Sequence, residues 1–336
     1  MAPLGLAPGP IALPVVGALP QIGMGMLAPA LSAQPHRRLS ELAGTYGDVM
    51  TVNFGPTPWV ILSSPEAVHE AFVTKGSEFA GRPSVASMSL SAGKGKAGFG
   101  RPVPNRELRN LRRAAYSSLF SDAAVDAKRT ELEAEAELLA NHLLATTRSA
   151  EPLRASLRRC VSNMVLRFAF SARVPYASEK KVPSSLASEI RFQEASGLKL
   201  PRERFAELLS LTDAIWSELS ATPTTVLDLL GVSADNVARR QLRVLIDRRN
   251  ALLSALISER RAQHRLVPGR AGGEVPPADM LDVLLASGLP EADILYTLVD
   301  LFVAGVNTVS TTIEWQLLLT ADRPLVQERA RAAALR

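Results

Sequence analysis

The sequence predicts a mainly α-helical protein with a small β-sheet, and three observations lead to this fold class. A long helical pattern runs from Pro290 to Asp322, and helical spacing also marks the segments 122–142 and 239–264. Two short runs at 49–54 and 59–63 favour strands, and the Gly-Pro-Thr-Pro segment between them predicts a hairpin. A chain of 336 residues is long enough to bury a sizeable core around these elements.

The composition argues against a nucleic-acid-binding protein and against a disulfide framework. Charged residues make up 21% of the chain, and the net charge is +5. The basic surplus indicates either a solvated surface or a docking face for an acidic partner. Basic stretches are not interleaved with stacking aromatic residues, so we expect no nucleic-acid partner. With one cysteine the chain cannot form an internal disulfide, and its four histidines show no metal-ligand spacing.

Residues 1–35 are predicted to form an uncharged leader rich in proline and glycine, followed by the main domain at 36–336. Prolines interrupt every apolar stretch of the leader that is long enough to cross a membrane. No basic segment precedes these stretches, so a secretory signal is not indicated either. Within the main domain we find no internal repeat and no clean domain boundary.

The first half of the main domain predicts short elements. A helix at 36–46 ends at Gly47, and after the hairpin Pro65 opens another helix, because proline suits the first helical turn. Residues 84–104 are rich in Ser, Gly, Lys and Pro and predict a loop. Cys160 lies in an apolar helical stretch without the positive surroundings that a reactive thiolate needs, so we interpret it as a buried small residue.

The second half of the main domain predicts further helices. Residues 188–211 are expected to contain helices, and 239–264 forms a long amphipathic helix. A polar loop rich in glycine follows at 265–277. It leads into a short apolar segment at 279–285 and then into the long helix.

The helix expected at 290–322 organises the chain. About 30 residues at roughly 1.5 Å each make a rod of roughly 45 Å. The pattern is apolar nearly all round, which predicts that the helix is buried. Yet its middle carries Gly305 and Asn307 beside several threonines, although glycine destabilises a helix by about 1 kcal/mol relative to alanine. Small residues next to a hydroxyl suggest that something flat lies against this helix.

The segment from Ala304 to Thr308, Ala-Gly-Val-Asn-Thr, resembles the distal-helix motif of cytochromes P450, Ala/Gly-Gly-x-Asp/Glu-Thr. The motif alone would also fit an ordinary buried helix, but the flanking Asp-Leu-Phe at 300–302 and Ile-Glu-Trp at 313–315 resemble the family as well. So do the blocks at 46–68 and 279–285. The chain resembles the N-terminal three quarters or so of a eukaryotic, microsomal-type cytochrome P450.

This resemblance implies a haem-dependent monooxygenase that inserts one atom of molecular oxygen into its substrate. The complete protein would use haem (iron protoporphyrin IX), an apolar small-molecule substrate, and a reductase as electron donor. The family usually has an acid at position 307, whereas an asparagine cannot ionise. The resemblance implies that Thr308 and Asn307 are catalytic and that Arg112, Ala304 and Gly305 bind the cofactor. It also implies that Leu301, Val306 and Thr312 contact the substrate.

Arg112 resembles the arginine of the family pattern Trp-x-x-x-Arg, which contacts a haem propionate. The planar guanidinium suits a carboxylate because it donates two parallel hydrogen bonds. Leu108 stands where the family has the tryptophan, and it cannot donate a hydrogen bond. The alternative is an arginine on a solvated helix face.

The resemblance stops before the family's Glu-x-x-Arg helix and its iron-ligating cysteine loop. Residues 328–331 have the letters Glu-x-x-Arg but follow the distal helix too soon, so we treat them as a coincidence. We therefore expect no metal ligand in this chain and an inactive fragment that shows no thiolate-bound haem. The alternative is a non-enzymatic helical fragment or interaction scaffold that never binds haem.

The cellular location is not assigned by the sequence. Residues 7–17 resemble the proline hinge of microsomal members, which sit on the cytoplasmic face of the endoplasmic reticulum. In those members an anchor helix precedes the hinge, and here too few residues precede it for such a helix.

Overall fold

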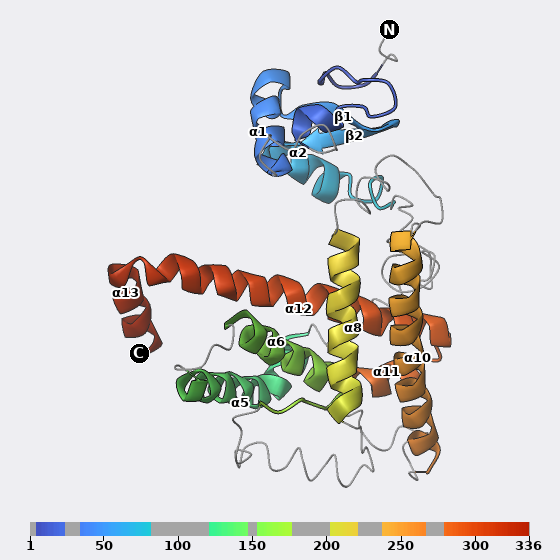
Figure 1. Ribbon diagram of the computed structural model, residues 1–336, viewed down its shortest axis with the longest axis vertical. Helices are drawn as coiled ribbons and strands as arrows, with labels where there is room; N and C mark the ends of the chain where they lie inside the picture. Colours follow the sequence, from blue (N-terminus) through green and yellow to red (C-terminus); the bar gives the residue numbers. More distant parts are fainter. Residues whose placement is uncertain are drawn as a thin grey trace. The chain divides into compact units, whose positions relative to one another are not determined.

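The computed structural model describes residues 5–23, 34–81, 121–146, 153–176, 202–220, 237–266 and 279–335. The chain divides into two compact units, one within residues 1–105 and 215–246 and the other mainly within 106–214 and 247–336 (Figure 1). Several predicted features lie outside the described residues: Leu108, Arg112, the loop expected at 84–104 and the first part of the segment 188–211. The predicted fold class, mainly α-helical with a small β-sheet, is confirmed.

The first unit contains the hairpin, whose strands pair antiparallel with Val49 opposite Leu62. Thr57 and Pro58 already belong to the second strand, so the turn is shorter than the four residues expected. Proline is tolerated there because it lies near the start of an edge strand. The elements of this unit are η1 (Leu19–Ile22), α1 (Pro35–Tyr46), β1 (Val49–Phe54), β2 (Thr57–Leu62), α2 (Pro65–His69) and the π-helical turn η2 (Glu70–Thr74).

The described part of the leader is attached to β1. The amide of Ala18 donates to the carbonyl of Asn53 at 2.7 Å, and the amide of Thr51 donates to the carbonyl of Pro8 at 2.9 Å. Gly17 makes this approach possible: it has a φ of +60°, and a Cβ there would lie 2.2 Å from the Asn53 carbonyl oxygen. A division of the chain at residue 35 remains a prediction.

The second unit is helical and centres on the long helix, as expected. α12 runs beside α6, and apolar residues of both helices share one core with parts of α8, α10 and α11 (Figure 1). The helices are α5 (Asp122–Thr146), α6 (Leu153–Phe170), α8 (Arg202–Ser220), α10 (Val237–Leu266), α11 (Met280–Ala286), α12 (Glu291–Ala321) and α13 (Pro324–Ala334). The boundaries between the two units fall within α8 and α10.

α12 has the predicted length but not the predicted burial. Pro290 precedes it and Glu291 and Asp293 occupy its first turn, where negative charge suits the helix dipole. Its first part is buried as expected, through residues such as Phe302. Its last third is not, since Trp315 is 59% exposed, and the expectation of burial along the whole rod was wrong there. By length and composition α12 could also cross a membrane, but its first part packs in the core of a helical unit.

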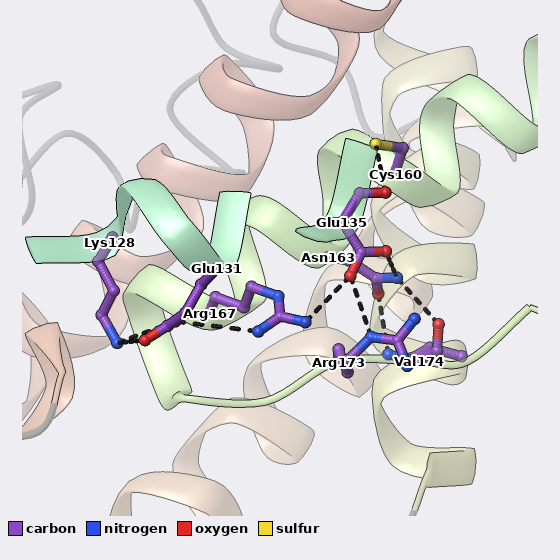
Figure 2. A network of polar contacts seen from close by, with 8 residues as sticks. All are labelled: Lys128, Glu131, Glu135, Cys160, Asn163, Arg167, Arg173 and Val174. Carbon is purple, nitrogen blue, oxygen red and sulfur yellow. Dashed lines mark hydrogen bonds and ion pairs between the residues drawn. The ribbon is translucent and has the colours of Figure 1, made fainter. Parts of the chain in front are cut away.

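A buried charge cluster joins α5 to α6 (Figure 2). The carboxylate of Glu135 accepts hydrogen bonds from Asn163 Nδ2 at 2.6 Å, Arg173 Nε at 3.0 Å and Arg167 Nη2 at 3.1 Å. Glu135 and Arg167 are both fully buried, so their opposite charges and hydrogen bonds must offset the loss of water. Cys160 lies beside this cluster, where its thiol contacts the Glu135 carbonyl oxygen at 3.9 Å.

A second buried arginine fixes the short helix α11. Arg260 of α10 donates to Asp282 at 2.6 Å and to Asp279 at 2.9 Å. Asp279 is also the N-cap of α11, because its carboxylate accepts the amide of Asp282 at 3.1 Å. Burial raises the pKa of Asp279 despite the adjacent guanidinium. This contact positions the segment that leads into α12.

Candidate functional site

The middle of α12 has one side in the core and another side exposed to solvent. Val306 is 3% exposed and lies in the core, whereas Ala304 and Thr308 are exposed. Residues four apart lie above one another on a helix, so Ala304 and Thr308 share one open strip. Leu301 lies on the edge of that strip and is partly buried. The structure therefore brings Leu301, Ala304 and Thr308 together and places Val306 elsewhere.

Gly305 is used for close packing against α6. A Cβ at this position would lie 3.1 Å from Val165 Cγ2, tighter than ordinary van der Waals contact. Gly305 therefore does not lie on the open strip with Thr308, although both belong to the segment that was expected to lie against something flat. The physical reason is the approach of α6, because two helices come this close only where one side chain is missing.

The hydroxyl groups of this strip donate back to the helix. Thr308 Oγ1 donates to the Ala304 carbonyl at 2.6 Å, and Thr312 Oγ1 donates to the Thr308 carbonyl at 2.8 Å. Such bonds to the carbonyl four residues earlier are common for threonine within helices. Both hydroxyl oxygens keep lone pairs that can accept a hydrogen bond. Thr312 is exposed, one turn after Thr308.

Asn307 is engaged by an arginine from another helix. Arg158 of α6 donates from Nη2 to Asn307 Oδ1 at 2.8 Å. The same Nη2 pairs with the carboxylate of Asp213 on α8. Burial raises the pKa of Asp213, more than the neighbouring Arg158 lowers it. Three helices thus meet at one guanidinium.

The sequence did not reveal Arg158 or Asp213 as site residues. They lie 55 positions apart, and Arg158 is 149 positions from Asn307. The one available signal was the presence of arginines within the otherwise apolar helix α6. Such arginines need acceptors nearby, but the sequence cannot say which helix supplies them.

A cavity of about 500 Å³ opens beside this contact, between α6 and α8. The sequence predicted helices within 188–211, and α8 begins inside that range. Near the cavity Arg154 donates to Glu314 of α12 at 2.9 Å. The polar residues that line it are Arg154, Arg158, Arg159, Ser162, Ser210 and Asp213.

Cys160 is not suited to bind iron. It is 4% exposed, and burial raises the pKa of its thiol to about 11. A thiolate ligand needs the opposite surroundings, which lower the thiol pKa. Cys160 is the chain's one cysteine, and within the described ranges no group of three His, Cys, Asp or Glu side chains could hold a metal ion.

A comparison with protein families agrees with the motif on the open strip of α12. A family model described as Cytochrome P450 matches residues 7–335. The chain belongs to the cytochrome P450 family. The family is one of haem monooxygenases, and its cofactor is haem. The segment of α12 from Ala304 to Thr308 is the one whose sequence resembles the motif of this family.

Curated relatives agree with the family assignment. Cytochrome P450 1B1 of Mus musculus is 29% identical over 342 residues, covering 97% of this chain and 56% of the mouse protein. Oryzalexin E synthase of Oryza sativa subsp. japonica is 27% identical, covering 98% of this chain and 58% of the rice protein. The chain thus spans less than two thirds of the length of these relatives, and less than the three quarters expected from the sequence.

A solved structure supports the fold. A zebra fish cytochrome P450 with progesterone has a TM-score of 0.67 to this chain, at 24% sequence identity. The match covers 89% of this chain and 62% of the zebra fish chain. This likeness shows that the helices are arranged as in a cytochrome P450.

Proposed function

We propose that this chain forms the oxygen-facing and substrate-facing side of a haem-dependent monooxygenase, and that the chain alone is inactive. The observation that carries the proposal is the open strip of Ala304 and Thr308 on α12. A central helix of a globular unit normally hides its middle. Here Ala304, Thr308 and Thr312 are exposed together along one side of that middle part. Bound haem would supply the redox chemistry of oxygen insertion.

The described residues fit one side of such a cofactor. The small side chain of Ala304 leaves room for a flat ring system against the helix, and Gly305 lets α12 keep its tight packing on α6 from behind. Arg112, which lies outside the described residues, is proposed to contact a propionate through its guanidinium. Ala304 and Arg112 are therefore the proposed cofactor-binding residues, and Gly305, which was expected among them, would act indirectly through its packing against α6.

Thr308 and Asn307 are the proposed catalytic residues. Thr308 Oγ1 lies on the open strip and donates to the Ala304 carbonyl at 2.6 Å. Its lone pairs can therefore accept a hydrogen bond from a donor on the solvent side. By rotating, the hydroxyl could instead donate toward the open side. The role proposed for Thr308 is therefore to hold a proton near the haem face. Asn307 would hold a partner by hydrogen bonding, because an amide cannot ionise.

The proposed substrate is an apolar small molecule, and the proposed electron donor is a reductase. Leu301 and Thr312 border the open strip and would contact the substrate. Val306 was expected beside them, but its core position makes its influence indirect, through the packing of α12. The structural neighbour from zebra fish was solved with progesterone, which is consistent with a pocket for an apolar ligand.

A scaffold role without haem is the second candidate, and one observation favours it. Large apolar side chains are exposed over the last third of α12 and on α13, among them Trp315, Leu318 and Leu325 at 59%, 52% and 75%. Exposed apolar surface of this kind marks a place where another segment or protein packs. In the monooxygenase proposal, this surface would instead pack against the part of the cytochrome P450 fold that this chain does not span.

The carbon monoxide difference spectrum separates the two candidates. The purified chain is given haem and reduced with dithionite, alone and after fusion to the C-terminal segment of a relative that carries the cysteine loop. We expect no thiolate-type Soret band from the chain alone and a clear band from the fusion. A band from the chain alone that disappears in Cys160→Ser would refute the assignment of Cys160 as an inert buried residue. A fusion that folds without taking up haem would support the scaffold.

A further inference from the structure

The contact between Arg158 and Asn307 fixes the direction of an amide. An asparagine has an acceptor at Oδ1 and a donor at Nδ2, whereas an arginine has donors alone. Arg158 Nη2 lies 2.8 Å from the side-chain amide, so the oxygen must face the arginine. Nδ2 is then the end of Asn307 that can interact elsewhere. It is buried and has no hydrogen-bond partner within the described residues.

A carboxylate at position 307 would behave differently. It would neutralise Arg158 directly and leave a second oxygen that accepts a hydrogen bond. In this chain the negative charge next to Arg158 comes from Asp213, which belongs to α8 rather than α12. The cytochrome P450 motif usually has its acid at the position of Asn307. The guanidinium therefore still has a carboxylate partner, but from a different helix.

We infer that Arg158 and Asp213 are positioning residues for Asn307, and that Asp213 supplies the negative charge which the motif usually carries at position 307. This inference rests on the proposed function, since it concerns the same oxygen-facing segment. The consequence is chemical. Position 307 presents a fixed N–H donor, one residue before Thr308, where a carboxylate would present an acceptor.

The charges around the guanidinium support this arrangement. Arg158 and Asp213 have side chains that are 29% and 43% exposed, so solvent screens their attraction only in part. Arg154 and Arg159 of α6 also line the cavity, and Arg154 is paired with Glu314 of α12. Asp213 is thus the carboxylate that lines the cavity beside Arg158.

The first test observes the amide itself. The chain is labelled with ¹⁵N-asparagine, and the side-chain amide signal of Asn307 is assigned by its loss in Asn307→Asp. As the pH is lowered, the signal should shift with a midpoint above the ordinary aspartate range, because Asp213 has a raised pKa. The shift should be absent in Asp213→Asn and retained in Glu207→Gln, which removes the acid that pairs with the exposed Arg248. The same titration in Asp213→Asn would overturn the inference.

The second test moves the carboxylate from one helix to the other. Melting temperatures are measured for the wild type, Asn307→Asp, Asp213→Asn and the double variant. Two carboxylates or none at one guanidinium are both less favourable than one, so the two changes should compensate. We expect the melting temperature of the double variant to exceed the value from adding the single shifts by about 2–4 °C. Simple additivity would contradict a shared arginine.

Neither measurement needs haem. Failure of these two tests with a normal carbon monoxide spectrum from the fused protein would remove the role of Asp213 and leave the monooxygenase proposal intact. If both tests succeed but the fused protein shows no thiolate-type band, the role of Asp213 stands as a feature of the helical unit, and the monooxygenase proposal fails.

Discussion

The clusters around Glu135 and Asn307 both connect α6 to other helices through an arginine, but they differ in how completely the group that the arginine contacts is paired. Glu135 is fully buried and its carboxylate accepts three hydrogen bonds (Figure 2). At the other cluster, Asn307 Oδ1 accepts from Arg158, but Asn307 Nδ2 is buried without a partner in the described parts of the chain.

This difference separates a structural role from a functional one. Buried polar groups are nearly always hydrogen-bonded, and an unpaired donor costs about 1–3 kcal/mol. The Glu135 cluster is therefore sufficient as a brace between α5 and α6. In the Asn307 cluster, Arg158 and Asp213 line the cavity, and the unpaired Nδ2 of Asn307 lies one residue from Thr308. An unsatisfied buried donor at this place marks the cluster as a candidate for function.

The largest effect is expected from breaking the Glu135 cluster. Arg167→Met removes one of the two guanidinium groups that contact the buried Glu135 carboxylate and should lower the free energy of unfolding by about 3–5 kcal/mol. Urea denaturation measures the change. Arg129→Met is the matched control, because Arg129 pairs with Asp126 on the exposed side of α5, and it should cause no measurable change. Equal effects of both variants would refute the structural role.

The pH dependence of stability provides a second measure of burial beside Glu135. The thiol of Cys160 has its pKa raised from 9.0 to about 11 by burial. The unfolded chain therefore loses this proton first, so stability is retained below pH 9 and lost as the pH rises toward 11. Relative to Cys160→Ala, the wild type should lose about 2–3 kcal/mol across this range. Parallel stability curves for the two proteins would show that the thiol is solvated.

The two sides of α12 can be distinguished at neighbouring positions. Gly305→Val places a branched side chain against Val165 and should destabilise the chain by about 1–3 kcal/mol. Ala304→Val introduces the same side chain on the open strip and should change stability by about 0.5 kcal/mol or less. Thermal unfolding of the two variants gives the comparison. A larger effect at Ala304 would mean that the strip is covered in the isolated chain.

The smallest effect on stability is expected at the exposed end of α12. Leu318 is 52% exposed, so Leu318→Gln should change the free energy of unfolding by about 0.5 kcal/mol or less. It should nevertheless reduce self-association, because it interrupts an apolar surface. Sedimentation velocity would detect this. Unchanged self-association would show that the apolar surface around Leu318 does not mediate it.

The sequence was sufficient to predict the elements that local rules define. Pro290, Glu291 and Asp293 marked the start of α12 because helix N-termini favour these residue types. The hairpin at Val49–Leu62 followed from its turn and its strand-forming residues. Of the α12 residues that the family resemblance indicated, Ala304, Thr308 and Thr312 lie on the open strip, whereas Gly305 and Val306 do not.

The contacts between distant segments could not be predicted. The approach of Val165 to Gly305 depends on the crossing of α6 and α12, and no local pattern encodes it. The pairing of Arg158 with Asp213 likewise depends on where α8 lies. Full burial of α12 was inferred from its apolar pattern, but such a pattern reports what a helix could bury rather than what covers it.

The proposed position of haem, against the open strip of α12, can be tested directly. The fused protein with a restored cysteine loop is prepared as Ala304→Trp and as Val309→Trp, because Val309 is also exposed, at 46%, but lies outside the strip. Haem uptake is measured by the carbon monoxide difference spectrum. We predict that Ala304→Trp abolishes the thiolate-type band while Val309→Trp retains it. A normal band from Ala304→Trp would show that haem does not lie against this face.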